Sequence, residues 1–112
     1  MSDLSRTGLS DRSLATIRAI FARFPEVERA VLYGSRAKGT HKPGSDLDLT
    51  LFGERLTDHT LLRVAGAFDD SSLPYTADLS RFASLKNEEL REHITRVGLE
   101  IYRRATPAQP TA

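Results

Sequence analysis

The sequence predicts one small α/β (α+β) domain, in which a mixed sheet of three to four strands is flanked by helices. Segments with helical periodicity alternate with short β-prone segments along the 112 residues. The composition, 39% hydrophobic and 28% charged, is typical of a globular chain rather than a disordered one. A chain of this length buries enough surface for one core and not for two.

The first half of the chain predicts, in order, a helix from Ser10 to Pro25, a strand at 29–33, a loop with one helical turn at 35–45 and a strand at 46–52. Ser10 is a good N-cap, and Pro25 ends the helical spacing of apolar residues. Gly34 follows the first strand. The second strand alternates strictly, so Asp46 and Asp48 lie on one face and three leucines on the other.

The second half predicts a helix that starts at Thr57 or Asp58, a strand at 74–79, a helix capped by Asn87 and closed by Gly98, and a short strand at 99–102. The apolar residues expected to face inward are Leu61, Leu62, Val64, Ala65 and Phe68 in the first helix and Leu90, Ile94 and Val97 in the second. Residues 10–104 form the predicted domain. Residues 1–9 are expected to be a flexible lead, and the Pro-containing residues 105–112 a disordered tail.

Composition excludes several classes of protein. The chain has no cysteine, which excludes a disulfide scaffold and any thiolate metal site. No apolar run is long enough to span a membrane, and the first residues lack the apolar core of a signal peptide. The formal net charge of +1 gives no support to a broad basic face that binds nucleic acid. We therefore expect a soluble, cytoplasmic domain.

The first two strands are predicted to pair antiparallel. Only eleven residues lie between Gly34, where the first strand ends, and Asp46, where the second begins, and these include the Pro43-Gly44 pair, whereas a parallel return needs a crossover of about a dozen residues or more. Antiparallel pairing places the end of the first strand beside the start of the second. Gly34 and Ser35 should then lie close to Asp46 and Asp48.

These residue types suit nucleotide phosphates and a divalent metal. Two carboxylates on one strand face repel each other, and Mg²⁺, which takes one or two carboxylates together with phosphate oxygens, relieves that repulsion. Gly34 allows a close approach of the backbone. Ser35 offers a hydroxyl and an N–H group to a phosphate.

Three further residues complete the predicted site. The side chains of Arg36 and Lys38 are candidates to neutralise a triphosphate. Asp78, in the third strand, is the candidate third carboxylate of a two-metal site and a group that could take a proton from an attacking hydroxyl. The predicted catalytic and metal-binding residues are thus Asp46, Asp48 and Asp78, and the predicted phosphate-binding residues are Gly34, Ser35, Arg36 and Lys38.

The string Gly34-Ser35, ten intervening residues and Asp46-x-Asp48 resembles the minimal nucleotidyltransferases of the polymerase-beta superfamily. The resemblance runs from about Leu14 to Tyr102. Lys38 departs from it, because family members often have a second Arg there. The resemblance implies a polymerase-beta-like fold and a reaction with two Mg²⁺ ions, in which AMP passes from ATP to a hydroxyl group. It further implies that the acceptor is a tyrosine of a small all-helical HEPN-type toxin, which this chain would neutralise as the antitoxin of a hetero-oligomer.

Two other functions remain open from the sequence. The chain could neutralise its partner by masking it, with no catalysis, or it could be the nucleotide-donor subunit of an enzyme that modifies a small molecule. If the chain is an enzyme, about a hundred structured residues leave no room for an acceptor site, so we expect another chain to supply the acceptor. The identity of the partner, the acceptor residue, the nucleotide base and the stoichiometry also remain open.

Overall fold

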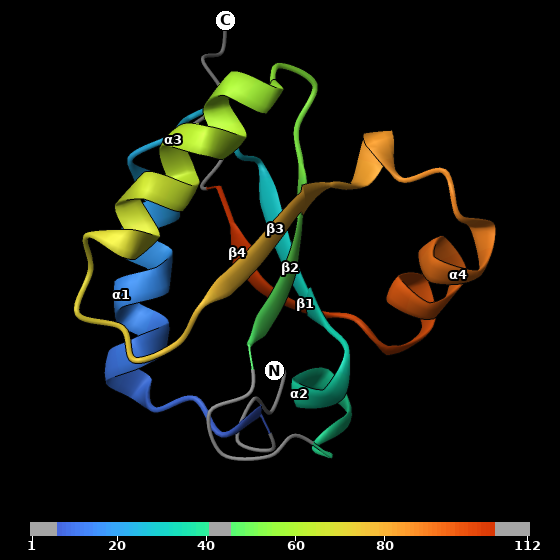
Figure 1. Ribbon diagram of the computed structural model, residues 1–112, viewed down its shortest axis with the longest axis horizontal. Coiled ribbons are helices and arrows are strands. Elements are labelled where there is room, and N and C mark those ends of the chain that lie inside the picture. Colours follow the sequence, from blue (N-terminus) through green and yellow to red (C-terminus); the bar gives the residue numbers. More distant parts are fainter. Residues whose placement is uncertain (1–6, 41–45, 105–112) are drawn as a thin grey trace, which may run out of the picture.

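The computed structural model describes residues 7–40 and 46–104, and Figure 1 shows their arrangement. The elements in order are α1 (Asp11–Ala22), β1 (Arg29–Tyr33), α2 (Ser35–Lys38), β2 (Leu47–Phe52), α3 (Asp58–Asp69), β3 (Ala77–Arg81), the 3-10 turn η2 (Phe82–Ser84), α4 (Glu88–Val97) and β4 (Leu99–Arg103). The predicted helix starts are confirmed: the side chains of Ser10, Thr57 and Asn87 each accept a backbone N–H three residues later.

The four strands form one mixed sheet in the order β3-β2-β1-β4. The predicted antiparallel pairing of β1 with β2 is confirmed, and β4 also pairs antiparallel with β1. Strand β3 runs parallel to β2, because α3 provides the crossover that a parallel return requires. The end of β1 and the starts of β2 and β3 therefore meet at one end of the sheet.

One face of the sheet is covered by α1 and α3, which lie together on the left of Figure 1. The leucines of β2 point toward these helices, and Leu47, Leu49 and Leu51 are fully buried. The alternation along β2 leaves Asp48 and Thr50 on the other face. The main core thus lies on one side of the sheet, and the polar residues of β2 lie on the side away from it.

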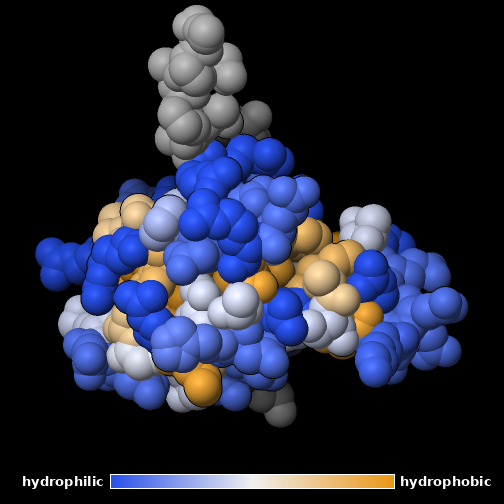
Figure 2. Space-filling view, turned by 90° about the horizontal axis from the view of Figure 1, so that it is seen from above, coloured by the Kyte–Doolittle hydropathy of each residue, from blue (hydrophilic) through white to orange (hydrophobic). Residues whose placement is uncertain are grey.

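Helix α4 lies on the second side of the sheet, on the right of Figure 1. Arg91 fixes it to the preceding turn, because its Nη1 donates to the carbonyl oxygens of Phe82 and Leu85 at 2.8 and 3.0 Å. Gly98 allows the chain to pass close to Val31, since a Cβ at this position would collide with that side chain. Figure 2 shows apolar surface between the body of the molecule and α4. A hollow between the sheet and α4 is lined by Phe52 and Phe82 together with Ile94.

Three sequence expectations differ from the structure. Strand β3 starts at Ala77 rather than at 74, because its ladder with β2 begins where Ala77 meets Leu47. Leu62 is 73% exposed and does not face inward, since Thr60, Val64 and Phe68 occupy the buried side of α3. Asp78 is consequently the second residue of its strand, whereas the predicted bounds of 74–79 make it the fifth of six.

The segment before α1 contains buried residues. Thr7 and Leu9 are buried, although they belong to the segment for which the sequence predicts a flexible lead. Residues 1–6, 41–45 and the predicted tail 105–112 lie outside the described residues. Among the helices of the described part, none has the length and apolar character needed to cross a membrane.

Candidate active site

Gly34 and Asp48 are in direct contact where β1 ends. Tyr33, the last residue of β1, pairs in register with Asp48 of β2, so the next residue along the chain reaches the Asp48 side chain. Gly34 has φ of 77°, a left-handed conformation that favours glycine. A Cβ at Gly34 would overlap the Asp48 carboxylate. The glycine therefore serves both the turn from β1 into α2 and the position of this carboxylate.

Asp78 joins Asp48 on the neighbouring strand. The two residues are register partners of the parallel β2–β3 pair, so their side chains lie on the same face. Asp46 is exposed just before β2, and Asp78 is also exposed, whereas Asp48 is half-buried. Burial raises the pKa of Asp48, and the nearby carboxylates of Asp78 and Asp46 raise it further. The charges of Asp78 and Asp46 thus both act on Asp48.

The oxygens of the three aspartates suit a divalent metal only when a phosphate supplies further oxygen ligands. Across residues 7–40 and 46–104, no three acidic, histidine or cysteine side chains lie close enough together to enclose an ion. Carboxylate oxygens that repel one another and raise the pKa of Asp48 are nevertheless the donors that Mg²⁺ takes beside phosphate oxygens. The aspartates therefore fit a metal that arrives with a phosphate, not a closed protein cage.

Helix α2 starts directly after Gly34 and positions Ser35 at its first residue. The first N–H groups of a helix have no acceptor within it, so they can face a phosphate. The structure thus brings together four of the predicted residues, Gly34, Ser35, Asp48 and Asp78, at one end of the sheet. Asp46 adjoins them at the start of β2.

Arg36 lies away from this group. Its side chain is 3% exposed, and its Nη1 donates to the carbonyl oxygen of Thr7 at 2.7 Å. Its guanidinium also lies 4.6 Å from the centre of the Tyr75 ring. The expected contact of Arg36 with phosphate does not fit this geometry, because the side chain points into the protein and binds the N-terminal segment to α2. The sequence cannot reveal this, since Thr7 is 29 residues away.

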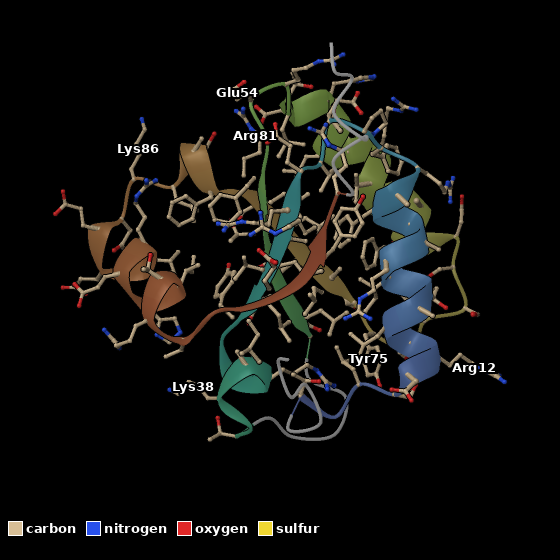
Figure 3. The ribbon with its side chains drawn as sticks, turned by 180° about the vertical axis from the view of Figure 1, so that it is seen from behind. Arg12, Lys38, Glu54, Tyr75, Arg81 and Lys86 are labelled. Atoms are coloured by element: carbon tan, nitrogen blue, oxygen red, sulfur yellow. The ribbon has the colours of Figure 1, made fainter. Side chains whose placement is uncertain are left out.

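Lys38 projects outward from α2, on the side away from Tyr75 (Figure 3), and it is exposed. His41 and Lys42, two further basic residues that follow α2 in the sequence, lie outside the described residues. Lys38 is therefore the exposed basic residue of α2.

Sequence reasoning missed three hydroxyl groups on the aspartate face. The Tyr33 side chain is hydrogen-bonded to that of Ser80 on β3, and Ser80 Oγ donates to Thr50 Oγ1 at 3.0 Å. Burial raises the pKa of Tyr33, as do the charges of Asp48 and Asp78, against the opposite effect of Ser80. The signal was available, because antiparallel pairing places the residue before Gly34 opposite Asp48.

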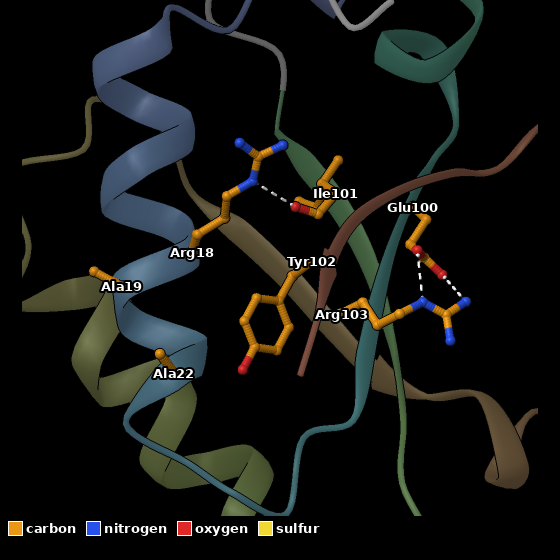
Figure 4. Close-up of a pocket in the computed structure, with 7 residues that line it drawn as sticks. All are labelled: Arg18, Ala19, Ala22, Glu100, Ile101, Tyr102 and Arg103. Carbon is orange, nitrogen blue, oxygen red and sulfur yellow. Dashed lines mark hydrogen bonds and ion pairs between the residues drawn. The ribbon is translucent and has the colours of Figure 1, made fainter. Parts of the chain in front are cut away.

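The described residues also line hollows away from the aspartates. One of about 570 Å³ lies between α1 and the outer edge of β4 (Figure 4), where Arg18 Nε donates to the Ile101 carbonyl oxygen at 2.8 Å. Glu100 and Arg103 pair at its rim. None of the predicted site residues lines it.

Comparison with known families agrees with this geometry. The model of the family described as Polymerase beta, Nucleotidyltransferase matches residues 15–107. The chain belongs to this nucleotidyltransferase family. It is also 32% identical over 114 residues to a probable protein adenylyltransferase, MntA, of Haemophilus influenzae, covering all of this chain and 99% of that one.

Solved structures share the nucleotidyltransferase fold. A toxin–antitoxin crystal structure with AMP-PNP matches 80% of this chain and 73% of its own, with a TM-score of 0.67 and 21% identity. An MntA–HepT variant, in which two aspartates two positions apart are replaced by glutamate, matches 85% of this chain and 74% of its own, with a TM-score of 0.65 and 18% identity. At these identities the structures support the fold of this family member, a four-stranded sheet flanked by helices.

Proposed function

We propose that this nucleotidyltransferase transfers AMP from ATP to a tyrosine hydroxyl of a helical HEPN-type toxin and so acts as its antitoxin. The observation that carries the proposal is the carboxylate of Asp48, held against Gly34 and in register with Asp78. A nucleotidyl transfer needs carboxylates that hold a metal where the phosphates bind, and the contact between Asp48 and Gly34, beside α2, suits this requirement.

Different residues contribute to different parts of the nucleotidyl transfer. The acceptor oxygen forms a bond to the α-phosphorus of ATP, the bond from that phosphorus to the bridging oxygen breaks, and pyrophosphate leaves. The exposed carboxylate of Asp78 suits uptake of the acceptor proton. Ser35, at the start of α2, offers its N–H and hydroxyl to the phosphates, and Lys38 adds a nearby positive charge.

We assign the metal to the same aspartates. Asp46 and Asp48 would hold a first Mg²⁺, with Asp78 contributing to a second, nearer the acceptor. When bound, these ions supply charge neutralisation on the phosphates and activation of the acceptor hydroxyl. The half-buried Asp48, whose pKa is raised by burial and by its acidic neighbours, would gain most from a cation.

The choice of ATP and of a protein acceptor is supported by relatives. The Haemophilus influenzae protein is named a probable protein adenylyltransferase, and a structural neighbour was crystallised with AMP-PNP. The tyrosine and the HEPN-type toxin follow from the resemblance to minimal nucleotidyltransferases. We also propose that the acceptor comes from this partner chain, in a hetero-oligomer, and that the reaction is cytoplasmic, where ATP and Mg²⁺ are available.

The test uses the purified chain with ATP labelled at the α-phosphate, Mg²⁺ and a lysate of its source cells. We expect one labelled protein of low mass, with AMP on a tyrosine by mass spectrometry. The label should disappear with Asp46→Asn and persist with Asp69→Asn, which changes an exposed aspartate at the end of α3. A small labelled product in place of a labelled protein would contradict the proposal.

Masking is separated from catalysis by a toxicity assay. Cells that express the toxin are given either the wild-type chain or the double variant Asp46→Asn/Asp48→Asn. Catalysis predicts that only the wild-type chain restores growth. Full rescue by the double variant, at equal expression, would assign neutralisation to binding alone.

A further inference from the structure

One tyrosine of the chain lies among the candidate catalytic groups. The sequence has three tyrosines, and all belong to the described residues. The ring of Tyr102 packs 5.5 Å from that of Phe21, and the ring of Tyr75 lies under the Arg36 guanidinium. Tyr33 is different, because it pairs in register with Asp48.

The Tyr33 hydroxyl is held close to both aspartates. Neighbouring strands lie about 4.8 Å apart, so the Tyr33 side chain on β1 can extend over β2 to β3. It does so, since it is hydrogen-bonded to the side chain of Ser80, two residues after Asp78 on the same face of β3. Ser80 Oγ also lies 3.0 Å from Thr50 Oγ1 on β2. The phenol is only half-buried, on the side of the sheet away from α1 and α3.

This position has the chemistry of the acceptor that the proposed reaction requires. We propose that the chain also transfers AMP to its own Tyr33, in cis. This inference rests on the proposed function, because it uses the same donor, the same aspartates and the same class of acceptor hydroxyl. It adds a modification site within the enzyme itself.

The step balances in the same way as transfer to a partner. Tyr33 Oη forms a bond to the α-phosphorus of ATP, and the bond from that phosphorus to the bridging oxygen breaks. Pyrophosphate leaves with that electron pair, and the phenolic proton passes to the Asp78 carboxylate and then to solvent. The product is an AMP–tyrosine phosphodiester and needs no other reactant.

The modification would be self-limiting. A phosphodiester on Tyr33 adds a negative charge beside Asp48 and Asp78, and it occupies the face that a second ATP would use. Each chain should therefore accept one AMP and then lose its activity toward the partner. Self-modification would inactivate the enzyme when ATP is present and the partner is absent.

The test is intact-mass and peptide analysis of the purified full chain after incubation with ATP and Mg²⁺. We expect a gain of one AMP that maps to the peptide containing Tyr33. It should be absent from Tyr33→Phe, which keeps the ring, and from Asp48→Asn. It should be retained in Tyr102→Phe, whose ring packs in the core away from the aspartates. Transfer within one molecule also predicts that an active Tyr33→Phe chain leaves the Asp48→Asn chain unmodified.

The same samples, with lysate added, distinguish the two proposals. If the wild-type chain labels a partner but never its own Tyr33, the inference is overturned and the proposed function stands. If neither the partner nor the chain is labelled, both are overturned. AMP on Tyr75 or Tyr102 instead of Tyr33, or on Tyr33 of the Asp48→Asn chain in the mixture, would also overturn transfer in cis to Tyr33.

Discussion

The residue that most constrains the site is one without a side chain. Gly34 has a positive φ, and its backbone lies next to the Asp48 carboxylate, so two separate steric restrictions act on this position. The backbone conformation of Gly34 strains any residue that has a Cβ, and the Asp48 carboxylate leaves no space for that Cβ. Together they tie the geometry of the turn to the geometry of the carboxylate.

Replacement of this glycine tests that connection. We expect Gly34→Ala to lower the free energy of unfolding by about 1–3 kcal/mol, because alanine disfavours the left-handed conformation. Nucleotidyl transfer should fall further than the loss of folded protein explains, since the methyl group displaces Asp48. Urea unfolding and initial rates on the same preparation measure both effects.

A matched control is available in α3. Gly66 lies in the middle of that helix, and a Cβ there would meet no atom within 4 Å. Gly66→Ala should stabilise the protein by up to about 1 kcal/mol and leave transfer unchanged. Equal effects of the two substitutions would contradict the specific role of Gly34.

Asp48 predicts a dependence of stability on pH. Its pKa is raised in the folded protein, so ionised Asp48 destabilises the fold as the pH rises through that value. Below the ordinary aspartate pKa of about 3.9 the group is protonated in both states and this effect is absent. We therefore expect Asp48→Asn to be at least as stable as wild type near pH 7, with the advantage lost near pH 3. Urea unfolding at the two pH values measures it.

The same variant should be inactive although it is stable. Loss of the carboxylate proposed to hold the metal at the phosphates should lower the transfer rate by about a hundredfold or more. Asp69→Asn, at the exposed end of α3, should change neither property appreciably. If Asp48→Asn were both less stable and less active, Asp48 would be a structural residue instead.

Among single residues, the sequence predicted those whose role follows from a local pattern. Gly34, Asp46 and Asp48 belong to one motif, and the pairing of two adjacent strands is enough to bring them together. Arg36 belongs to the same string, but its partners Thr7 and Tyr75 are distant in the chain. A buried guanidinium and an exposed one look alike in a sequence, because only the fold determines which way the side chain points.

At the scale of elements, α2 is too short to be stable by itself, and Arg36 anchors it. Four residues form barely one turn, and helices much shorter than a dozen residues depend on tertiary contacts. The contact with Thr7 also explains why the packed structure includes residues before the Ser10 cap. The N-terminal segment therefore supports the end of the sheet at which the aspartates meet.

Arg36 and Lys38 give a matched comparison within α2. Arg36→Ala should lower the free energy of unfolding by about 2–4 kcal/mol without any nucleotide present, because it removes a buried charged hydrogen bond and the contact with Tyr75. Lys38→Ala should leave stability nearly unchanged, because its side chain is exposed. It should weaken ATP binding, because it removes a positive charge near the phosphates. Thermal unfolding of the free protein and ATP titration separate the two effects. If Arg36→Ala had a normal melting temperature and bound ATP weakly, Arg36 would instead be a phosphate-binding residue.

The elements themselves were predicted well wherever caps and periodicity agree. The starts of α1, α3 and α4 follow from Ser10, Thr57 and Asn87, whose side chains make the expected hydrogen bonds. The sequence places the start of β3 three residues too early, because residues 74–76 are as β-prone as those that follow. Its true start is set by pairing with β2, a long-range contact that local propensity does not contain.

At the scale of the whole molecule, the site and the fold share the same elements. The candidate residues come from the end of β1, the start of α2, and the first residues of β2 and β3. None of these elements can unfold without dispersing the site. A ligand that binds there must therefore stabilise the entire domain, since it binds the folded state and not the unfolded chain.

This coupling predicts a thermal shift that depends on both nucleotide and metal. At a ligand concentration about 100 times Kd, binding adds about 2.7 kcal/mol, which raises the melting temperature of a small domain by on the order of 10 °C. The probe should be α,β-methylene ATP with Mg²⁺, whose α–β bridge resists transfer. Chelation of the metal should remove the shift, because the carboxylates would then face the phosphates without a cation between them. Asp46→Asn/Asp48→Asn should show a much smaller shift, and Asp69→Asn the full one. An equal shift in the double variant would mean that the nucleotide binds at a different surface of the molecule.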